Sequence, residues 1–213
     1  MKRIGLGWAV ALALAGSMCA TAQTVEGRKA ETVAVLPWIF LKGTDGAVKT
    51  AKERLTDILT TSAFEIAQEA DVRTAWSKMG RSLDPDRAEL PSAKALLQLG
   101  HKLGVDYVLT GRAQWHTRSI WVGFGPKTKS TCTVDLIIVD VKKDRVALNA
   151  RKVWMDSTTK EDPLKAAGAV LLTPLVTVVS GGPKTPHEQR AAQLAIGKAI
   201  KPWLEQRAAR SER

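Results

Sequence analysis

The sequence has the length and composition of one globular domain with a basic surface. It has 213 residues, 45% of them hydrophobic, and a formal net charge of +11. This apolar fraction excludes wholesale disorder, and the two cysteines are too few for a disulfide-rich scaffold. The basic residues are scattered along the chain. We therefore interpret the charge as a solvated surface that attracts anionic neighbours, with no nucleic acid as a partner.

The segment 1–22 has the pattern of a secretory signal peptide of bacterial type. A basic start precedes an apolar run at 4–16, and an Ala-Thr-Ala cleavage motif ends at Ala22. We predict cleavage there and a mature protein that is periplasmic or secreted. An uncleaved anchor is disfavoured because the run is short for a bilayer. Lipid attachment at Cys19, giving an outer-membrane lipoprotein, is a less favoured alternative because Met18 is bulky.

The first part of the mature chain predicts two strands around a helix, after a flexible arm at 23–31. The β-branched apolar run 32–41 predicts a buried strand. Pro37 marks its end or a bulge, because proline cannot donate a hydrogen bond within a sheet. Apolar residues recur at helical spacing over 47–62, which predicts an amphipathic helix. Residues 64–67 predict a short second strand.

Two further helices are predicted before the longest strands. Asp71 is placed to cap a helix that Gly80 ends. A loop rich in Asp and Pro follows over 82–91. Pro91 opens the next helix, since proline suits the first helical turn, and Gly104 stops it.

The centre of the chain predicts an antiparallel β-meander of three or four strands. Alternating residues begin at Val105 and continue to about residue 122. The segment 131–141 is the clearest strand in the sequence. A tight polar turn at 142–145 separates it from a further strand at 146–155.

The turn before residue 131 nearly matches a phosphate-binding loop. Gly123, Lys129 and Ser130 meet the pattern G-x-x-x-x-G-K-[ST], but Thr128 stands where the pattern requires glycine. A phosphate-binding loop opens a helix whose amides hold the phosphate, whereas a strand follows here. We therefore predict a hairpin turn with Lys127 and Lys129 at its tip, and no nucleotide site.

The chain closes with two predicted helices. A strongly apolar segment at 164–182 is followed by an amphipathic helix that begins at Thr185. We predict a single domain at 32–207, with its C-terminal helical part at 164–207, and a frayed tail at 208–213. The fold class is α/β: a mixed sheet with an antiparallel β-meander, helices packed on it, and two C-terminal helices.

The sequence contains no recognisable catalytic or metal motif. His101, His116 and His187 lack the spacing of metal ligands. We expect no enzyme activity, no metal and no cofactor. The alternative is a periplasmic hydrolase of an envelope polymer whose site is assembled from distant residues. Cys132 remains after cleavage and is predicted to be a buried, inert thiol, with an intermolecular disulfide as the alternative.

Three stretches resemble the superfamily of TolB amino-terminal and curli-secretion (CsgG-like) proteins. They are VAVLPW (33–38), LGHKLGVDYVLTGRA (99–113) and VDLIIVDVKKDRVALNARKVW (134–154). The last contains Lys142-Lys143-Asp144-Arg145 where the family often has a Thr-Gly turn. The resemblance covers about 32–155. It implies an α/β domain with helices on a mixed sheet, and a binding or assembly role in the bacterial envelope.

One set of candidate partner contacts lies on the predicted meander. It combines Trp115, Trp121 and Trp154 with Arg112 and Arg118, since Trp and Arg dominate binding hot spots. The favoured interpretation is core aromatics with ordinary surface bases beside them. The alternative is a recognition face, which requires the tryptophans and the bases to share one face of the sheet.

A second candidate is the uncharged segment 166–182, which Pro174 interrupts. The favoured interpretation is a helix that caps the core. The alternative is an element that dips into the membrane or joins copies in a homo-oligomer, with Leu171 and Leu175 as contacts. We therefore expect a non-catalytic exported protein that binds an envelope protein or an anionic surface, or that assists secretion or transport.

Overall fold

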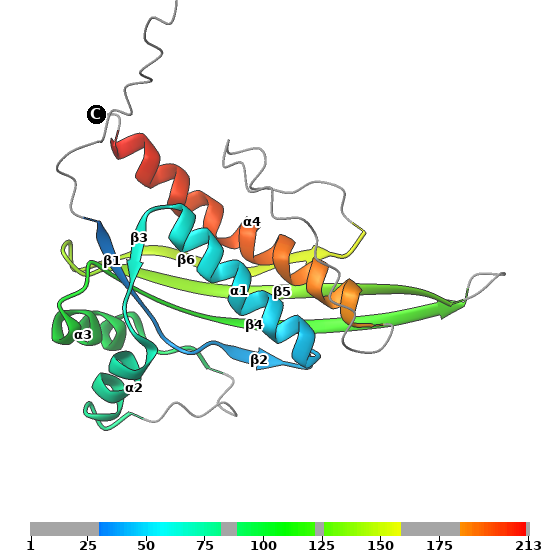
Figure 1. Cartoon of the computed structure of the whole chain (residues 1–213), viewed down its shortest axis with the longest axis horizontal. Helices are drawn as coiled ribbons and strands as arrows, with labels where there is room; N and C mark the ends of the chain where they lie inside the picture. Colours follow the sequence, from blue (N-terminus) through cyan, green and yellow to red (C-terminus); the bar gives the residue numbers. More distant parts are fainter. Residues whose placement is uncertain (1–29, 82–88, 122–125, 159–183, 212–213) are drawn as a thin grey trace, which may run out of the picture.

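A mixed sheet with helices on both faces forms the fold (Figure 1). The computed structural model describes residues 30–81, 89–121, 126–158 and 184–211. In chain order, the elements are β1 (Glu31–Val35), β2 (Ile39–Leu41), α1 (Asp45–Thr61), β3 (Phe64–Ile66), α2 (Glu69–Ser77), α3 (Ala93–Leu103), β4 (Tyr107–Trp121), β5 (Pro126–Asp140), β6 (Arg145–Asp156) and α4 (Thr185–Ser211).

The strands combine parallel and antiparallel pairing, as predicted. Their order is β3-β1-β4-β5-β6, and β2 also pairs with β4. β1 and β2 both run parallel to β4, while β4, β5 and β6 form the antiparallel meander. The long β4–β5 hairpin extends beyond the helices (Figure 1). Its register places Trp115 opposite Cys132.

The two faces of the sheet are covered to different extents. Alternate residues of β4 and β5, among them Leu109, Trp115 and Leu136, pack under α1 and α4. On the other face, Val108 and Ile137 pack under α2 and α3. Those two short helices lie near one end of the strands, whereas α1 and α4 run along the sheet (Figure 1). Among the described helices, none therefore covers the rest of the second face of the meander.

Several predicted boundaries differ from those in the structure. Pro37 divides the predicted strand 32–41 into β1 and β2, in keeping with its expected role. Asp71 does not cap α2, because Gln68 precedes the helix and Asp71 lies in its first turn. Pro91 does not open α3, whose cap is Ser92 with its hydroxyl accepting from the Ala95 amide. Gly104 ends this helix as predicted, with a φ of 67°.

The predicted turn at 123–130 is too long. Pro126 to Ser130 belong to β5, and Ser130 is paired with Thr117 of β4. Polar residues at this end suggested a turn, but the cross-strand ladder continues through them because it is formed by backbone groups and not by side chains. Strand therefore runs directly through Lys127 and Lys129, and the geometry of a phosphate-binding loop is not formed.

The C-terminal helix is present, and its predicted face is buried. Ala192, Ile196, Ala199 and Trp203 are at most 3% exposed. α4 continues to Ser211, beyond the predicted end of the domain at 207. The predicted signal peptide and the segment 164–182 lie outside the described residues. Among the helices that the structure does describe, none is long and apolar enough to cross a membrane.

Replacing Gly100 with Ala should destabilise the protein, although alanine is the better helix former by about 1 kcal/mol. A Cβ at this position in α3 would lie 2.3 Å from a methyl group of Val141 and 3.0 Å from one of Val108. Overpacking of this kind costs ~1–3 kcal/mol. Urea unfolding should show a lower midpoint for Gly100→Ala. Gln98→Ala, at an exposed position of the same helix, should leave the midpoint nearly unchanged, and equal midpoints for both variants would contradict the packing.

Candidate binding surfaces

Trp115 belongs to the core and does not form a surface contact. Its side chain is 1% exposed. The indole Nε1 donates a hydrogen bond to the Glu188 carbonyl oxygen at 3.0 Å. Gly43 packs directly against the ring, because a Cβ there would be 2.5 Å from the indole. The favoured prediction, a core aromatic, therefore describes Trp115.

Glu188 is a buried carboxylate that joins distant segments. It is 3% exposed and accepts from the backbone N–H of Thr44 at 3.0 Å and from the Thr117 hydroxyl at 2.7 Å. The hydroxyls of Thr117 and Ser130 are 2.7 Å apart. Thr44 is the N-cap of α1, so the negative charge lies at a helix N-terminus, where it is favoured. This role could not be predicted from the sequence, because no pattern in it places residue 188 beside residue 44.

The uncovered face of the meander carries the predicted basic residues. We call the side chains that point from this face the open meander face. It is formed by Arg112, Gln114, His116 and Arg118 of β4, Lys129, Thr131 and Thr133 of β5, and Arg151 and Trp154 of β6. Gln114, Thr133 and Trp154 form one cross-strand row. Arg118 donates to the His116 ring at 2.8 Å.

Trp115 and Trp154, two of the three predicted tryptophans, lie on opposite faces of the meander. Trp154 is 58% exposed and lies on the same face as Arg112 and Arg118, whereas Trp115 faces the opposite side. The side chain of Trp121 lies outside the described residues, as do Leu171 and Leu175. Only one tryptophan of the set is therefore placed on this face with the basic residues, and Trp115 does not belong to the alternative recognition face.

An ion pair organises the base of this face. The Arg112 guanidinium donates to the Asp135 carboxylate, with Nε at 3.1 Å. The Lys152 amide donates to the other carboxylate oxygen at 2.7 Å. The Lys152 amide lies at an irregularity of β6, where Lys152 has a φ of 52°. Burial by itself raises the pKa of Asp135, but the Lys152 amide and the Arg112 guanidinium outweigh it and hold this pKa below its ordinary value.

Cys132 is the buried thiol that the sequence predicted. It is fully buried beneath α4. Burial, and then the negative charge of Glu188, raise the pKa of Cys132 to about 12. The thiol is therefore neutral at physiological pH and is not accessible for a disulfide with another chain.

A large cavity lies beside β2, at an edge of the sheet. It has a volume of about 1120 Å³ and lies between α1, α2 and the β1–β2 segment. Aromatic walls come from Trp38, Phe40 and Trp76. Sequence reasoning missed this cavity, because its walls come from six elements, β1, β2, α1, β3, α2 and β4, that the sequence does not place beside each other. In the described ranges, no three His, Cys, Asp or Glu side chains are grouped as metal ligands.

These elements define an α/β domain with a mixed six-stranded sheet, and known proteins resemble it only weakly. No family model matches the chain, and no curated protein matches its sequence. The resemblance to TolB and curli-secretion proteins stays a prediction.

Three solved structures have partly similar folds. Lipoprotein GNA1162 from Neisseria meningitidis has 13% identity and a TM-score of 0.42, over 66% of this chain and 94% of that one. The LpoB C-terminal domain from Salmonella enterica has 16% identity and a TM-score of 0.37, over 61% and 85%. PelC from Paraburkholderia phytofirmans, a dodecamer, has 17% identity and a TM-score of 0.35, over 81% of this chain and 87% of that one. Similarities at this level carry no conclusion about function.

Replacing Asp135 with Asn should destabilise the protein by about 2 kcal/mol at neutral pH, since hydrogen bonds to a charged group are lost. The folded-state pKa of Asp135 is below its unfolded value of about 3.9. The ionised Asp135 carboxylate therefore stabilises the folded protein at a pH above its unfolded pKa. This stabilisation is lost as the pH falls through the folded-state pKa.

The free energy of unfolding in urea at pH 7 and pH 3 measures this effect. The difference between wild type and Asp135→Asn should shrink at pH 3. Glu53→Gln, which removes an exposed pair with Lys49 at 3.8 Å, should change stability by less than about 0.5 kcal/mol. A difference for Asp135→Asn that stays constant with pH would contradict the role of the carboxylate charge.

Proposed function

We propose that the mature chain is a non-catalytic binding protein of the bacterial envelope and that its open meander face contacts an anionic surface. The predicted signal peptide supports an exported protein. The formal net charge, +11 for the whole sequence and +9 without Lys2 and Arg3 of the predicted signal peptide, supports attraction to anionic neighbours. Phospholipid headgroups are the anionic surface that such a protein meets in the envelope.

The observation that carries this proposal is that exposed Trp154 and several basic side chains share the part of this sheet face that no described helix covers. Arg118 and Arg151 are exposed there, and Trp154 is 58% exposed. Exposed large apolar side chains are few among the described residues, and Trp154 is the largest of them. Tryptophan has an affinity for the membrane–water interface, and arginine pairs with phosphate. Together they form a surface suited to lipid headgroups.

The test uses the purified mature chain and sedimentation with vesicles. Vesicles of phosphatidylglycerol should bind the chain, and vesicles of phosphatidylcholine should not. Arg118→Glu and Trp154→Ala should each weaken binding about tenfold, which corresponds to ~1.4 kcal/mol. Binding should also weaken as salt is added, because the attraction is electrostatic.

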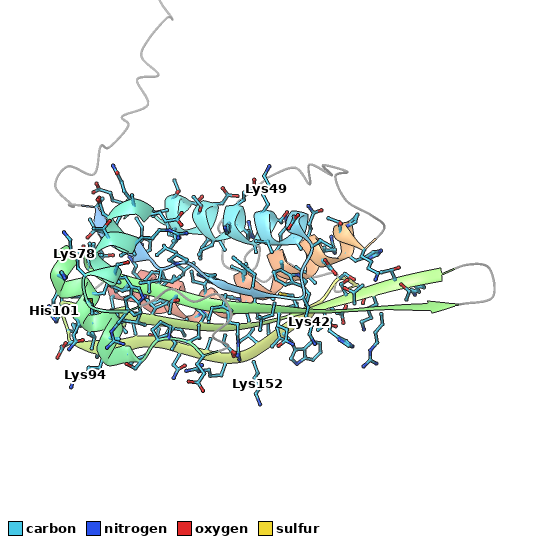
Figure 2. All side chains as sticks on the ribbon, turned by 90° about the horizontal axis from the view of Figure 1, so that it is seen from below. Lys42, Lys49, Lys78, Lys94, His101 and Lys152 are labelled. Carbon is cyan, nitrogen blue, oxygen red and sulfur yellow. The ribbon has the colours of Figure 1, made fainter. Side chains whose placement is uncertain are left out.

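Lys49→Glu is the matched control for charge. Lys49 projects from α1, on the opposite side of the molecule from Lys152 of β6 (Figure 2). Lys49→Glu changes the net charge by the same amount as Arg118→Glu and should leave vesicle binding nearly unchanged. Equal weakening by both substitutions would show diffuse attraction by net charge, and absence of binding to anionic vesicles would point to an acidic envelope protein instead. Either result would overturn the proposed surface.

A further inference from the structure

The cavity beside β2 follows a free edge of the sheet. β2 pairs with β4 on one side, and no described strand pairs with its other side. β3 is short: its last register pair is Val33 with Ile66, and the Ala67 amide bonds back to the Val33 carbonyl at 2.9 Å. β3 therefore pairs with β1 only and does not extend beside β2. An edge of this kind can accept another strand.

The cavity occupies the space where that additional strand would lie. Ile66 and Ala67 line it where β3 ends, and Ile39 and Phe40 of β2 line its inner side. α1 contributes Leu55 from above the sheet, and α2 contributes further residues from below. Because these two helices lie on opposite faces of the sheet, the groove between them is open in the plane of the strands. Figure 1 shows α1 and α2 on either side of this edge.

The walls of the groove are aromatic, and cations lie over them. The rings of Trp38 and Phe40 are stacked, with centroids 6.3 Å apart. Lys52 of α1 lies 5.7 Å from the Phe40 centroid, and Arg81 lies 5.4 Å from the Trp76 centroid. Lys52 and Arg81 therefore place positive charge on two sides of the groove. Among the described residues, no carboxylate lies within ion-pair distance of either cation.

A polar group in the same wall also lacks a partner. The indole Nε1 of Trp38 is buried and has no hydrogen-bond acceptor among the described residues. Leaving such a donor unpaired is unfavourable. The ring itself is held in place, because it packs against Gly111, where a Cβ would be 2.8 Å from the indole. The groove therefore combines a fixed aromatic wall, a free strand edge and an excess of positive charge, because Lys52, Arg73 and Arg81 outnumber Glu69 and Glu89 in its lining.

We propose that this groove binds an extended peptide segment of a partner protein, which adds a strand beside β2. Strand addition provides main-chain hydrogen bonds to the edge, and alternate side chains enter pockets. Every second side chain of the segment would be apolar and would lie against Trp38, Phe40 and Trp76. An acidic side chain would meet Lys52 or Arg81. The occupant is thus an extended segment that alternates apolar and acidic residues.

The probe is a fluorescently labelled octapeptide of alternating valine and aspartate, and binding to the purified mature chain is measured by fluorescence anisotropy. We expect saturable binding. The same peptide with its alternate amides N-methylated should bind at least tenfold more weakly, because it cannot pair as a strand. An octapeptide of alternating valine and lysine should also bind at least tenfold more weakly, because the groove is positively charged.

Matched substitutions on α1 locate the site. Thr56→Trp fills the groove from an exposed position, and Thr60→Trp places the same ring one turn further along, where Thr60 does not line the cavity. Lys52→Glu reverses a charge in the groove, and Lys49→Glu reverses one outside it. Thr56→Trp and Lys52→Glu should each weaken binding at least tenfold, while the two controls should not. Circular dichroism verifies that each variant is folded.

Three results would overturn this proposal: no saturable binding of the acidic peptide, equal binding of the N-methylated peptide, or equal effects of Thr56→Trp and Thr60→Trp. Equal binding of the N-methylated peptide would indicate a groove for an apolar chain such as an acyl group. The experiment is independent of the proposed vesicle binding. Arg118→Glu, which lies on the open meander face, should leave peptide affinity unchanged even where it abolishes binding to vesicles.

Discussion

The buried contacts of Trp115 and Glu188 connect segments that are far apart in the chain. The Trp115 indole donates to the Glu188 carbonyl, and the Glu188 carboxylate accepts from the Thr44 amide and the Thr117 hydroxyl. A single residue of α4 thereby fixes the start of α1 and the middle of β4. An unpaired carboxylate at this depth would be costly, so its partners must be in place whenever α4 is docked.

The placement of α1 and α4 along one face determines which surfaces stay open. The core beneath them contains the large side chains of β4 and β5 that point to the same face of the sheet as Trp115. The remaining side chains of the same strands must then point to the other face, because successive residues of a strand alternate. Since α2 and α3 reach only one end of that face, polar and basic residues occupy the rest of it. The open meander face is thus a direct consequence of the core.

The two proposed surfaces use different physical interactions. The open meander face is flat and basic, and it offers charge and one exposed indole to an anionic surface. The groove beside β2 is concave and aromatic, and it offers a strand edge in addition to charge. Strand pairing depends on peptide backbone geometry, whereas attraction to headgroups depends on charge and salt. One chain could therefore bind a peptide and an anionic surface at the same time, without competition between the two sites.

The sequence by itself determined the local elements. Residue periodicity indicated α1, α3, α4 and the meander. Cys132 was predicted to be buried because it lies within an apolar strand. The sequence could not show that Trp115 is the core aromatic while Trp154 is exposed, because that depends on which face α4 covers. It also could not find Glu188 or the groove, since both are formed by contacts between residues far apart in the chain. Only the tertiary structure decides such features, because hydrogen bonds and cavities depend on distances in space, which local periodicity does not specify.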